Sequence, residues 1–142
     1  MAGNKGRTPL HLAAEYNNPE IMRLLLQSGA LIEAIDDSDW SPLHLCTESS
    51  VAEILVEHGA DINHRDDSGL TPLHHAILYE DLELFTTLRS YGASTQIRTR
   101  VDGRDVTDMI EDMADLQLRD AFTAAVNVVG RLRSKALIQK NK

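Results

Sequence analysis

Apolar residues near the start of the chain follow two short helical patterns with a polar turn between them. The first pattern consists of Leu10, Ala13 and Ala14, and the second of Ile21, Met22, Leu25 and Leu26. Spacings of three and four residues place each set on one face of a helix. Thr8 can cap the first helix, and Pro9 then occupies the first helical position, where no N–H donor is needed. The pattern predicts a helix–turn–helix unit.

The same unit recurs along the chain. The start of its first helix reads GRTPLH at residues 6–11, and this segment returns as DWSPLH at 39–44 and as GLTPLH at 69–74. A Gly-Ala pair follows each copy, at residues 29–30, 59–60 and 92–93. Thr8 and Ser41 are 33 residues apart, and Ser41 and Thr71 are 30 apart. Such a period predicts a repeat protein in which each unit packs on its neighbours.

The repeated motif resembles the ankyrin repeat. The resemblance rests on the run TPLHLAA at residues 8–14, the run TPLH at 71–74 and the run GADIN at 59–63. It implies an all-α ankyrin-repeat solenoid, in which stacked helix–turn–helix repeats are joined by β-hairpin-like loops. We expect an ankyrin repeat domain over residues 1–122, with repeats at about 3–33, 34–63, 64–96 and 97–122.

Two repeats depart from the pattern. Repeat two has 20 residues from Ser41 to Ala60, where repeats one and three have 23 over the same span, so we expect a shortened first helix and a local notch. Asp39 replaces the usual Gly of the hairpin, and Asp tolerates a positive φ better than most residues. Repeat four has a hairpin loop with about one extra residue at 98–104, and Asp105 can cap the helix that follows.

The two ends of the chain raise separate expectations. We expect an extended C-terminal helix with a basic tail over residues 115–142, because apolar residues recur with a heptad-like spacing at Leu118, Phe122, Ala125, Val129, Leu132 and Ala136. This helix either packs back on repeat four, reaches out to a partner or a second copy, or frays from about residue 131. At the start of the chain, no polar repeat precedes the first motif, so we expect one face of repeat one to be uncovered and the chain to belong to a longer protein.

Charge narrows the classes of partner. The net charge is −8, which argues against nucleic-acid binding. Residues 1–120 hold 9 basic and 22 acidic residues, whereas residues 121–142 hold 5 basic residues and no acid. Membrane contact is therefore expected at most weakly, through the basic tail. The single cysteine excludes an internal disulfide, and no apolar run approaches the length of a membrane span, so we expect a cytoplasmic or nuclear protein.

Candidate chemistry is sparse, and we expect neither an enzyme nor a bound cofactor or metal. The resemblance implies that His11, His44 and His74 are structural residues that tie down the hairpins. The other histidines lack the spacing of a zinc site, and Cys46 occupies a small-residue position, where a buried thiol is expected. One modification is a candidate, because Asn63 matches the position at which ankyrin repeats are hydroxylated by a factor-inhibiting oxygenase. The alternative is that Asn63 only hydrogen-bonds its own loop.

The remaining candidate function is protein binding. The resemblance implies binding through hairpin tips and the outer face of the first helices, at Tyr16, Ile35, Asp37, Trp40, Glu48, Asp67, Leu70, Leu78, Tyr79 and Arg104. We expect Trp40 and Tyr79 to anchor a partner segment, with Asp37, Glu48 and Asp67 favouring a basic one. Trp40 could instead fold over the deletion in repeat two and fill the notch. The alternative function is a regulatory or scaffolding segment of a larger ankyrin-containing enzyme, channel or effector.

Overall fold

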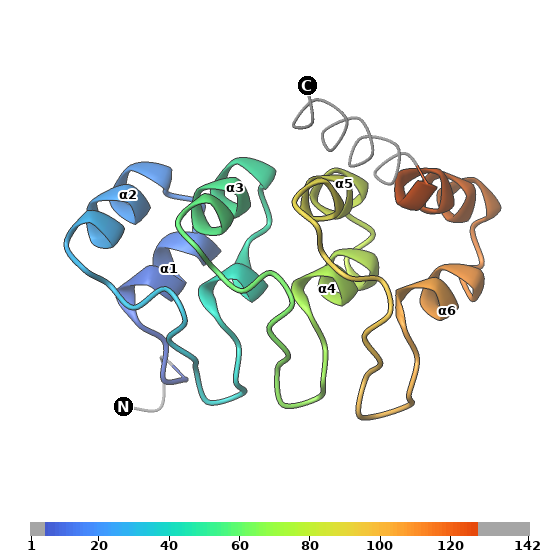
Figure 1. Ribbon diagram of the computed structural model, residues 1–142, viewed down its shortest axis with the longest axis horizontal. Helices are drawn as coiled ribbons and strands as arrows, with labels where there is room; N and C mark the ends of the chain where they lie inside the picture. The colour runs from blue at the N-terminus through green and yellow to red at the C-terminus, as the bar shows by residue number, and fades with distance from the viewer. Residues whose placement is uncertain (1–4, 128–142) are drawn as a thin grey trace, which may run out of the picture.

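Helix pairs stack side by side in a single row, with hairpin loops projecting from one edge of the row (Figure 1). The computed structural model describes residues 5–127. Its elements are α1 (Pro9–Glu15), α2 (Pro19–Gln27), the 3-10 helix η1 (Pro42–Leu45), α3 (Ser49–Glu57), α4 (Pro72–Leu78), α5 (Leu82–Ser90), α6 (Val106–Glu111) and a last helix over 116–127. No strand forms within residues 5–127. The all-α solenoid predicted from the repeats is confirmed.

Side-chain caps start most of the helices, as the motif predicts. The Thr8 hydroxyl accepts from the backbone N–H of His11, and Pro9 is the first residue of α1. Asp81 caps α5 in the same way by accepting from Leu84 N at 3.0 Å. In repeat four, Asp105 accepts from the backbone N–H of Asp108 at 3.0 Å, which confirms the expected Asp cap. A cap of this kind typically stabilises a helix by about 1 kcal/mol.

Repeat two is shortened where the residue count predicts. Its first helix is the four-residue 3-10 helix η1, whereas α4 of repeat three has seven residues. The chain then enters α3 through Glu48, whose side chain makes no capping bond. Asp39 holds the hairpin turn with a φ of 61°, close to the 79° of Gly69 in repeat three, so Asp does replace Gly in the left-handed region.

Each hairpin is closed by a hydrogen bond between its two arms. Asp36 N donates to Trp40 O at 3.0 Å, and Asp66 N donates to Leu70 O at 2.9 Å. In repeat four the closing bond joins Thr99 N to Arg104 O at 3.0 Å, which encloses one more residue and confirms the expected insertion. Asp36 and Asp66 also accept two backbone N–H groups each through Oδ1, which fixes the turns.

Backbone hydrogen bonds also link each hairpin tip to the preceding one. The bonds of this tip ladder are Asp37 N to Lys5 O at 2.8 Å, Asp67 N to Ser38 O at 3.1 Å and Arg100 N to Ser68 O at 2.9 Å. The three acceptors are equivalent positions of successive repeats. The ladder therefore holds neighbouring repeats in one common register.

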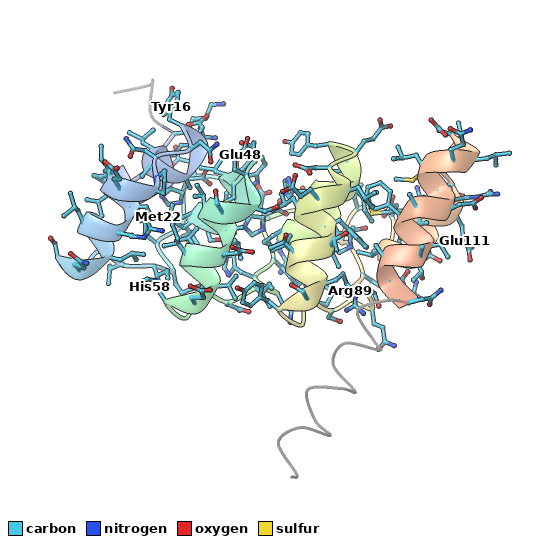
Figure 2. All side chains as sticks on the ribbon, turned by 90° about the horizontal axis from the view of Figure 1, so that it is seen from above. Tyr16, Met22, Glu48, His58, Arg89 and Glu111 are labelled. Carbon is cyan, nitrogen blue, oxygen red and sulfur yellow. The ribbon has the colours of Figure 1, made fainter. Side chains whose placement is uncertain are left out.

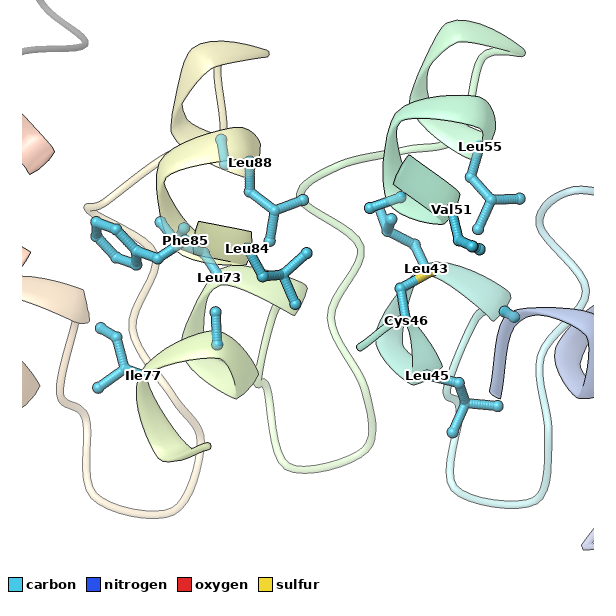
Figure 3. Packing of buried hydrophobic residues seen from close by; sticks show 14 of the residues in the cluster. Leu43, Leu45, Cys46, Val51, Leu55, Leu73, Ile77, Leu84, Phe85 and Leu88 are labelled. Carbon is cyan, nitrogen blue, oxygen red and sulfur yellow. The ribbon is translucent and has the colours of Figure 1, made fainter. Parts of the chain in front are cut away.

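The buried apolar residues of all the repeats form one core cluster between the first and second helices. Figure 3 shows its part in repeats two and three. Leu55, Leu73, Phe85 and Leu88 are each at most 1% exposed. Phe85 of α5 meets Phe122 edge-on, with ring centroids 5.0 Å apart, so the last helix packs back on repeat three. We expected this helix to pack back on repeat four, whereas this ring contact joins it to α5 of repeat three. This helix crosses residue 122, where we expected the repeat domain to end. The later positions of the heptad-like seam and the basic tail lie outside the described residues.

Candidate interaction surface

The repeated histidines tie neighbouring hairpins together. In repeat one, His11 Nδ1 accepts from Thr8 N at 3.1 Å, and His11 Nε2 lies 2.7 Å from Trp40 O of the next hairpin. In repeat two, His44 Nδ1 accepts from Ser41 N at 3.2 Å, and Nε2 lies 3.0 Å from Leu70 O. The structural role implied by the resemblance is confirmed for these two residues.

The third motif histidine is satisfied only in part. His74 Nδ1 accepts from Thr71 N at 3.1 Å, as in the other repeats. Its buried Nε2 makes no comparable hydrogen bond within residues 5–127. The hairpin that it faces is the longer one of repeat four. Burial lowers the pKa of His74, and the backbone of Ile97 and Arg104 in that hairpin acts in the opposite direction.

Burial keeps His44 neutral at physiological pH. The side chain is 3% exposed, and this burial is the main reason why its pKa is lowered from 6.5 to about 4. A neutral imidazole carries one proton. The bonds described above place that proton on Nε2, facing Leu70 O, and the lone pair on Nδ1, facing Ser41 N.

Two clusters within residues 5–127 bring together side chains of the kinds that bind metals. His44, Asp66 and His75 are buried, and their candidate ligand atoms lie within 4.8 Å of one another. Both ring nitrogens of His44 are already used in hydrogen bonds, so His44 has no lone pair left for an ion. The second cluster is Glu33, Asp61 and His64. There, Glu33 accepts from Asp61 N at 2.7 Å, and His64 Nε2 faces a backbone carbonyl at 3.1 Å. We assign neither cluster to a metal.

A hollow of about 300 Å³ opens beside the shortened helix of repeat two. Trp40 and Tyr79 lie in its lining, together with Arg7, Glu15, His44, Leu45, Cys46 and Thr47. The Trp40 ring packs edge-on against His75 at 4.6 Å and stacks on His44 at 6.2 Å between ring centroids. Trp40 thus leans onto the core, as the alternative interpretation held, and forms one wall of the notch without filling it.

His75 supports this wall and was not singled out from the sequence for that role. Its Nε2 lies 3.0 Å from Asp66 Oδ2, and both side chains are almost fully buried. Repeats one and two carry Leu12 and Leu45 at the same position. A polar residue at a position that is elsewhere apolar was the available signal. The His75–Asp66 pair joins the first helix of repeat three to its own hairpin, directly beneath Trp40.

A second hollow, of about 270 Å³, brings Leu70, Leu78 and Arg104 together. Leu78 is 55% exposed and Tyr79 is 64% exposed, so the end of α4 separates the two hollows. Arg104 is held within its own repeat, because it forms ion pairs with Asp102 and Asp112 and donates to Asp108 O. Val101, which is 79% exposed, also lines this hollow and was not among the predicted residues.

The other predicted contact residues lie outside the two hollows. Tyr16 is 76% exposed, and Ile35 is 48% exposed at a hairpin. Asp37, Glu48 and Asp67 are also exposed, and none of the three forms an ion pair with another residue in the 5–127 range. Figure 2 shows Tyr16 and Glu48 along one edge of the molecule, opposite the edge with His58 and Arg89.

The hydrogen bonds of Asn63 reach beyond its own loop, contrary to the alternative that it bonds only that loop. Its side-chain Oδ1 accepts from Ser94 N of the next repeat at 2.9 Å, while its backbone N–H donates to Asp61 Oδ1 at 3.0 Å. The side chain therefore bridges two repeats. Hydroxylation of Asn63 stays a prediction, and an enzyme acting on its Cβ would have to reach it beside this bridge.

Cys46 is buried at 5% exposure, as expected. Burial raises the pKa of its thiol to about 12, so the reactive thiolate is scarce at neutral pH. Within the part of the chain that the structure describes, no helix is long and apolar enough to cross a membrane.

Comparisons with known proteins agree with the architecture. The sequence model of the family described as Ankyrin repeats (3 copies) matches residues 1–66 and 32–99. The fowlpox virus (strain NVSL) ankyrin repeat protein FPV230 is 40% identical over 43 residues, which is 30% of this chain. The match spans 23% of that relative's own length, so the relative extends well beyond the shared segment.

Proposed function

Because the chain belongs to the ankyrin repeat family, whose repeats are generally protein–protein interaction modules, we propose that it binds a partner protein through its hairpin tips and first helices. The hollow between Trp40 and Tyr79 is the centre of this surface. It lies beside the first helix that repeat two leaves incomplete, which distinguishes repeat two from repeats one and three. Ankyrin repeats are generally non-catalytic, and binding a partner protein requires no catalysed reaction.

The observation that carries the proposal is the packing and exposure of the two aromatic side chains that line the hollow, Trp40 and Tyr79. Trp40 is held from behind by His75 and His44, whereas Tyr79 is 64% exposed at the end of α4. A ring that is already packed on one side loses little conformational freedom when a partner covers the other side. Aromatic residues in such positions are frequent energetic centres of interfaces.

Charge favours a basic partner segment. The carboxylates of Asp37, Glu48 and Asp67 are exposed around this surface without ion-pair partners among the described residues, and the net charge of the chain is −8. Glu15 in the hollow is paired with Arg7 at 2.9 Å. A lysine or arginine side chain between the two rings would gain a cation–π contact worth about 0.5–2 kcal/mol.

Peptide selection on the intact chain tests the proposal. We expect phage-displayed peptides enriched on the natural protein, and depleted on a Trp40→Ala variant, to carry Lys or Arg next to an apolar residue. Trp40 is the only tryptophan, so its fluorescence reports binding directly at the hollow. Trp40→Ala and Tyr79→Ala should each weaken a selected peptide at least about tenfold, measured by calorimetry.

Tyr91→Ala is the matched control. Tyr91 is an exposed aromatic residue at the C-terminal end of α5, and it lies outside both hollows. It should leave the affinity unchanged. Peptides that bind equally well to the natural chain and to Trp40→Ala would contradict the proposal. Selected peptides that are acidic would contradict only the charge of the partner.

The alternative role, as a scaffolding segment of a larger ankyrin-containing enzyme, channel or effector, has one observation in its favour. Repeat one exposes an apolar face on the side away from repeat two. Placement in the cytoplasm or nucleus stays a prediction from the sequence.

A further inference from the structure

The side of repeat one that faces away from repeat two is apolar and open. Leu12 is 39% exposed, Ile21 48%, Leu24 62% and Leu31 77%. Beside them lies an almost purely apolar hollow of about 240 Å³, lined by Thr8, Pro9, Leu10, Leu25, Ala30, Leu31 and Ala34. Contiguous apolar surface of this kind usually marks an interaction site.

Three of the four equivalent positions are buried in repeat two. Leu12 corresponds to Leu45 and His75, which are 8% and 5% exposed. Ile21 corresponds to Val51 and Leu84, which are 0% and 5% exposed. Leu24 corresponds to Ile54, which is 5% exposed, and to the half-buried Thr87 of repeat three. Leu31 corresponds to Asp61 and Ser94, which are polar and not buried. Burial in later repeats is therefore shared by the positions of Leu12 and Ile21, and by that of Leu24 in repeat two.

The cover in the later repeats comes from the preceding repeat. His75 of repeat three contacts Trp40 and His44 of repeat two, with ring centroids 4.6 and 5.2 Å apart. In the same way α1 packs on η1, α2 on α3, and α3 on α5. The open face of repeat one thus has the composition of an inter-repeat interface.

The opposite end of the described row is different. The hollow there is lined by Thr107, Ile110, Glu111, Thr123, Val126 and Asn127, and four of these six side chains are polar. Thr107, Glu111, Thr123 and Asn127 are all exposed. This polar surface does not match the apolar face of repeat one, which disfavours direct contact between these two surfaces in two copies of the chain.

We propose that the open face of repeat one, formed by Leu12, Ile21 and Leu24, is the docking surface of a further ankyrin repeat. That repeat stacks in the register set by the tip ladder and continues the existing row of interfaces. The face of the added repeat that contacts repeat one is apolar, like the face of repeat two that contacts repeat three. The proposal is independent of the partner bound at the Trp40 hollow.

A fusion supplies such a repeat directly. A second copy of residues 34–66 placed immediately before residue 4 keeps the spacing that joins repeat two to repeat three. In a repeat protein, stability is roughly a sum of repeat terms and nearest-neighbour interface terms. If the open face accepts the added repeat, the midpoint of thermal unfolding should rise by at least about 5 °C, measured by calorimetry and circular dichroism.

The matched control carries Ile21→Glu together with Leu24→Glu, in both the fused and the unfused chain. In the unfused chain both residues are exposed, so the midpoint should change by less than about 2 °C. In the fused chain the same substitutions should abolish the gain, because they place two charges in the new interface. Trp40→Ala at the original position only, with the added copy unchanged, should leave the gain intact, which separates this proposal from the partner-binding one.

Two outcomes would overturn the proposal. One is a fused chain whose midpoint does not rise, or rises equally with and without the glutamate substitutions. The other is a natural chain that sediments as a dimer and becomes monomeric with Ile21→Glu and Leu24→Glu, which would assign the face to a second copy of this chain.

Discussion

Repeats two and three share the same Pro-Leu-His start, yet only repeat three completes its first helix. In repeat two the chain leaves η1 after Leu45 and enters α3 without a side-chain cap, whereas Asp81 caps α5 in repeat three. The hydrogen bonds of the motif histidine survive the deletion, since His44 still accepts from Ser41 N and faces Leu70 O of the next hairpin. The comparison teaches that the last turn of the first helix is dispensable for stacking, and that its loss creates the hollow.

The largest expected effect concerns the pH dependence of stability that His44 gives to repeat two. The pKa of His44 is lowered to about 4 in the folded chain and returns to about 6.5 on unfolding. Protonation therefore favours the unfolded state: the stabilisation is complete above pH 6.5 and is lost as the pH falls toward 4. The loss from His44 alone should reach about 3 kcal/mol in the free energy of unfolding.

Urea unfolding at several pH values between 7 and 4 checks this expectation. His44→Gln should lower stability at pH 7, because the ring hydrogen bonds are altered. It should also flatten the dependence on pH by up to about 1.4 kcal/mol per pH unit in the steepest part. Equal slopes for the natural chain and the variant would contradict the assigned role of His44.

A smaller effect is expected from making repeat three resemble its neighbours at the position of His75. His75→Leu restores the residue type of Leu12 and Leu45, yet it leaves Asp66 Oδ2 buried without its partner. We expect a loss of about 1–3 kcal/mol in the free energy of unfolding at pH 7. The double variant His75→Leu with Asp66→Asn should be less destabilised than the sum of the two single variants, and simple additivity would show that the pair is not coupled.

The smallest expected effect is at the hairpin turn. Asp39→Gly relieves a non-glycine residue at a φ of 61°, but it also loosens the unfolded chain, so we expect a change within about 0.5 kcal/mol. The reverse change, Gly69→Asp, should cost clearly more. A Cβ at Gly69 would lie 2.7 Å from Arg100 N, so the hairpin of repeat four would have to shift. Thermal unfolding that ranks the two variants in the opposite order would contradict this distinction.

Most of the scaffold could be predicted because its signals are local. The caps, the proline positions, the shortened helix and the extra hairpin residue all depend on a few neighbouring residues. The site was predicted less completely because its contacts join residues far apart in sequence. Trp40 was predicted to anchor a partner, but the ring that supports it belongs to His75 in the next repeat. Arg104 was predicted as a contact residue, and its guanidinium forms ion pairs with Asp102 and Asp112.

The tip ladder fixes the spacing of the contact points that the row of hairpin tips offers to a partner. Because Lys5, Ser38 and Ser68 each accept a backbone bond from the following hairpin, the spacing between successive tips is set by peptide geometry rather than by side chains. The hairpin tips are therefore regularly spaced contact points. A partner that contacts several tips therefore binds to positions with a fixed spacing. Substitutions of the tip side chains change which partner is preferred, and they leave the spacing between the tips unchanged.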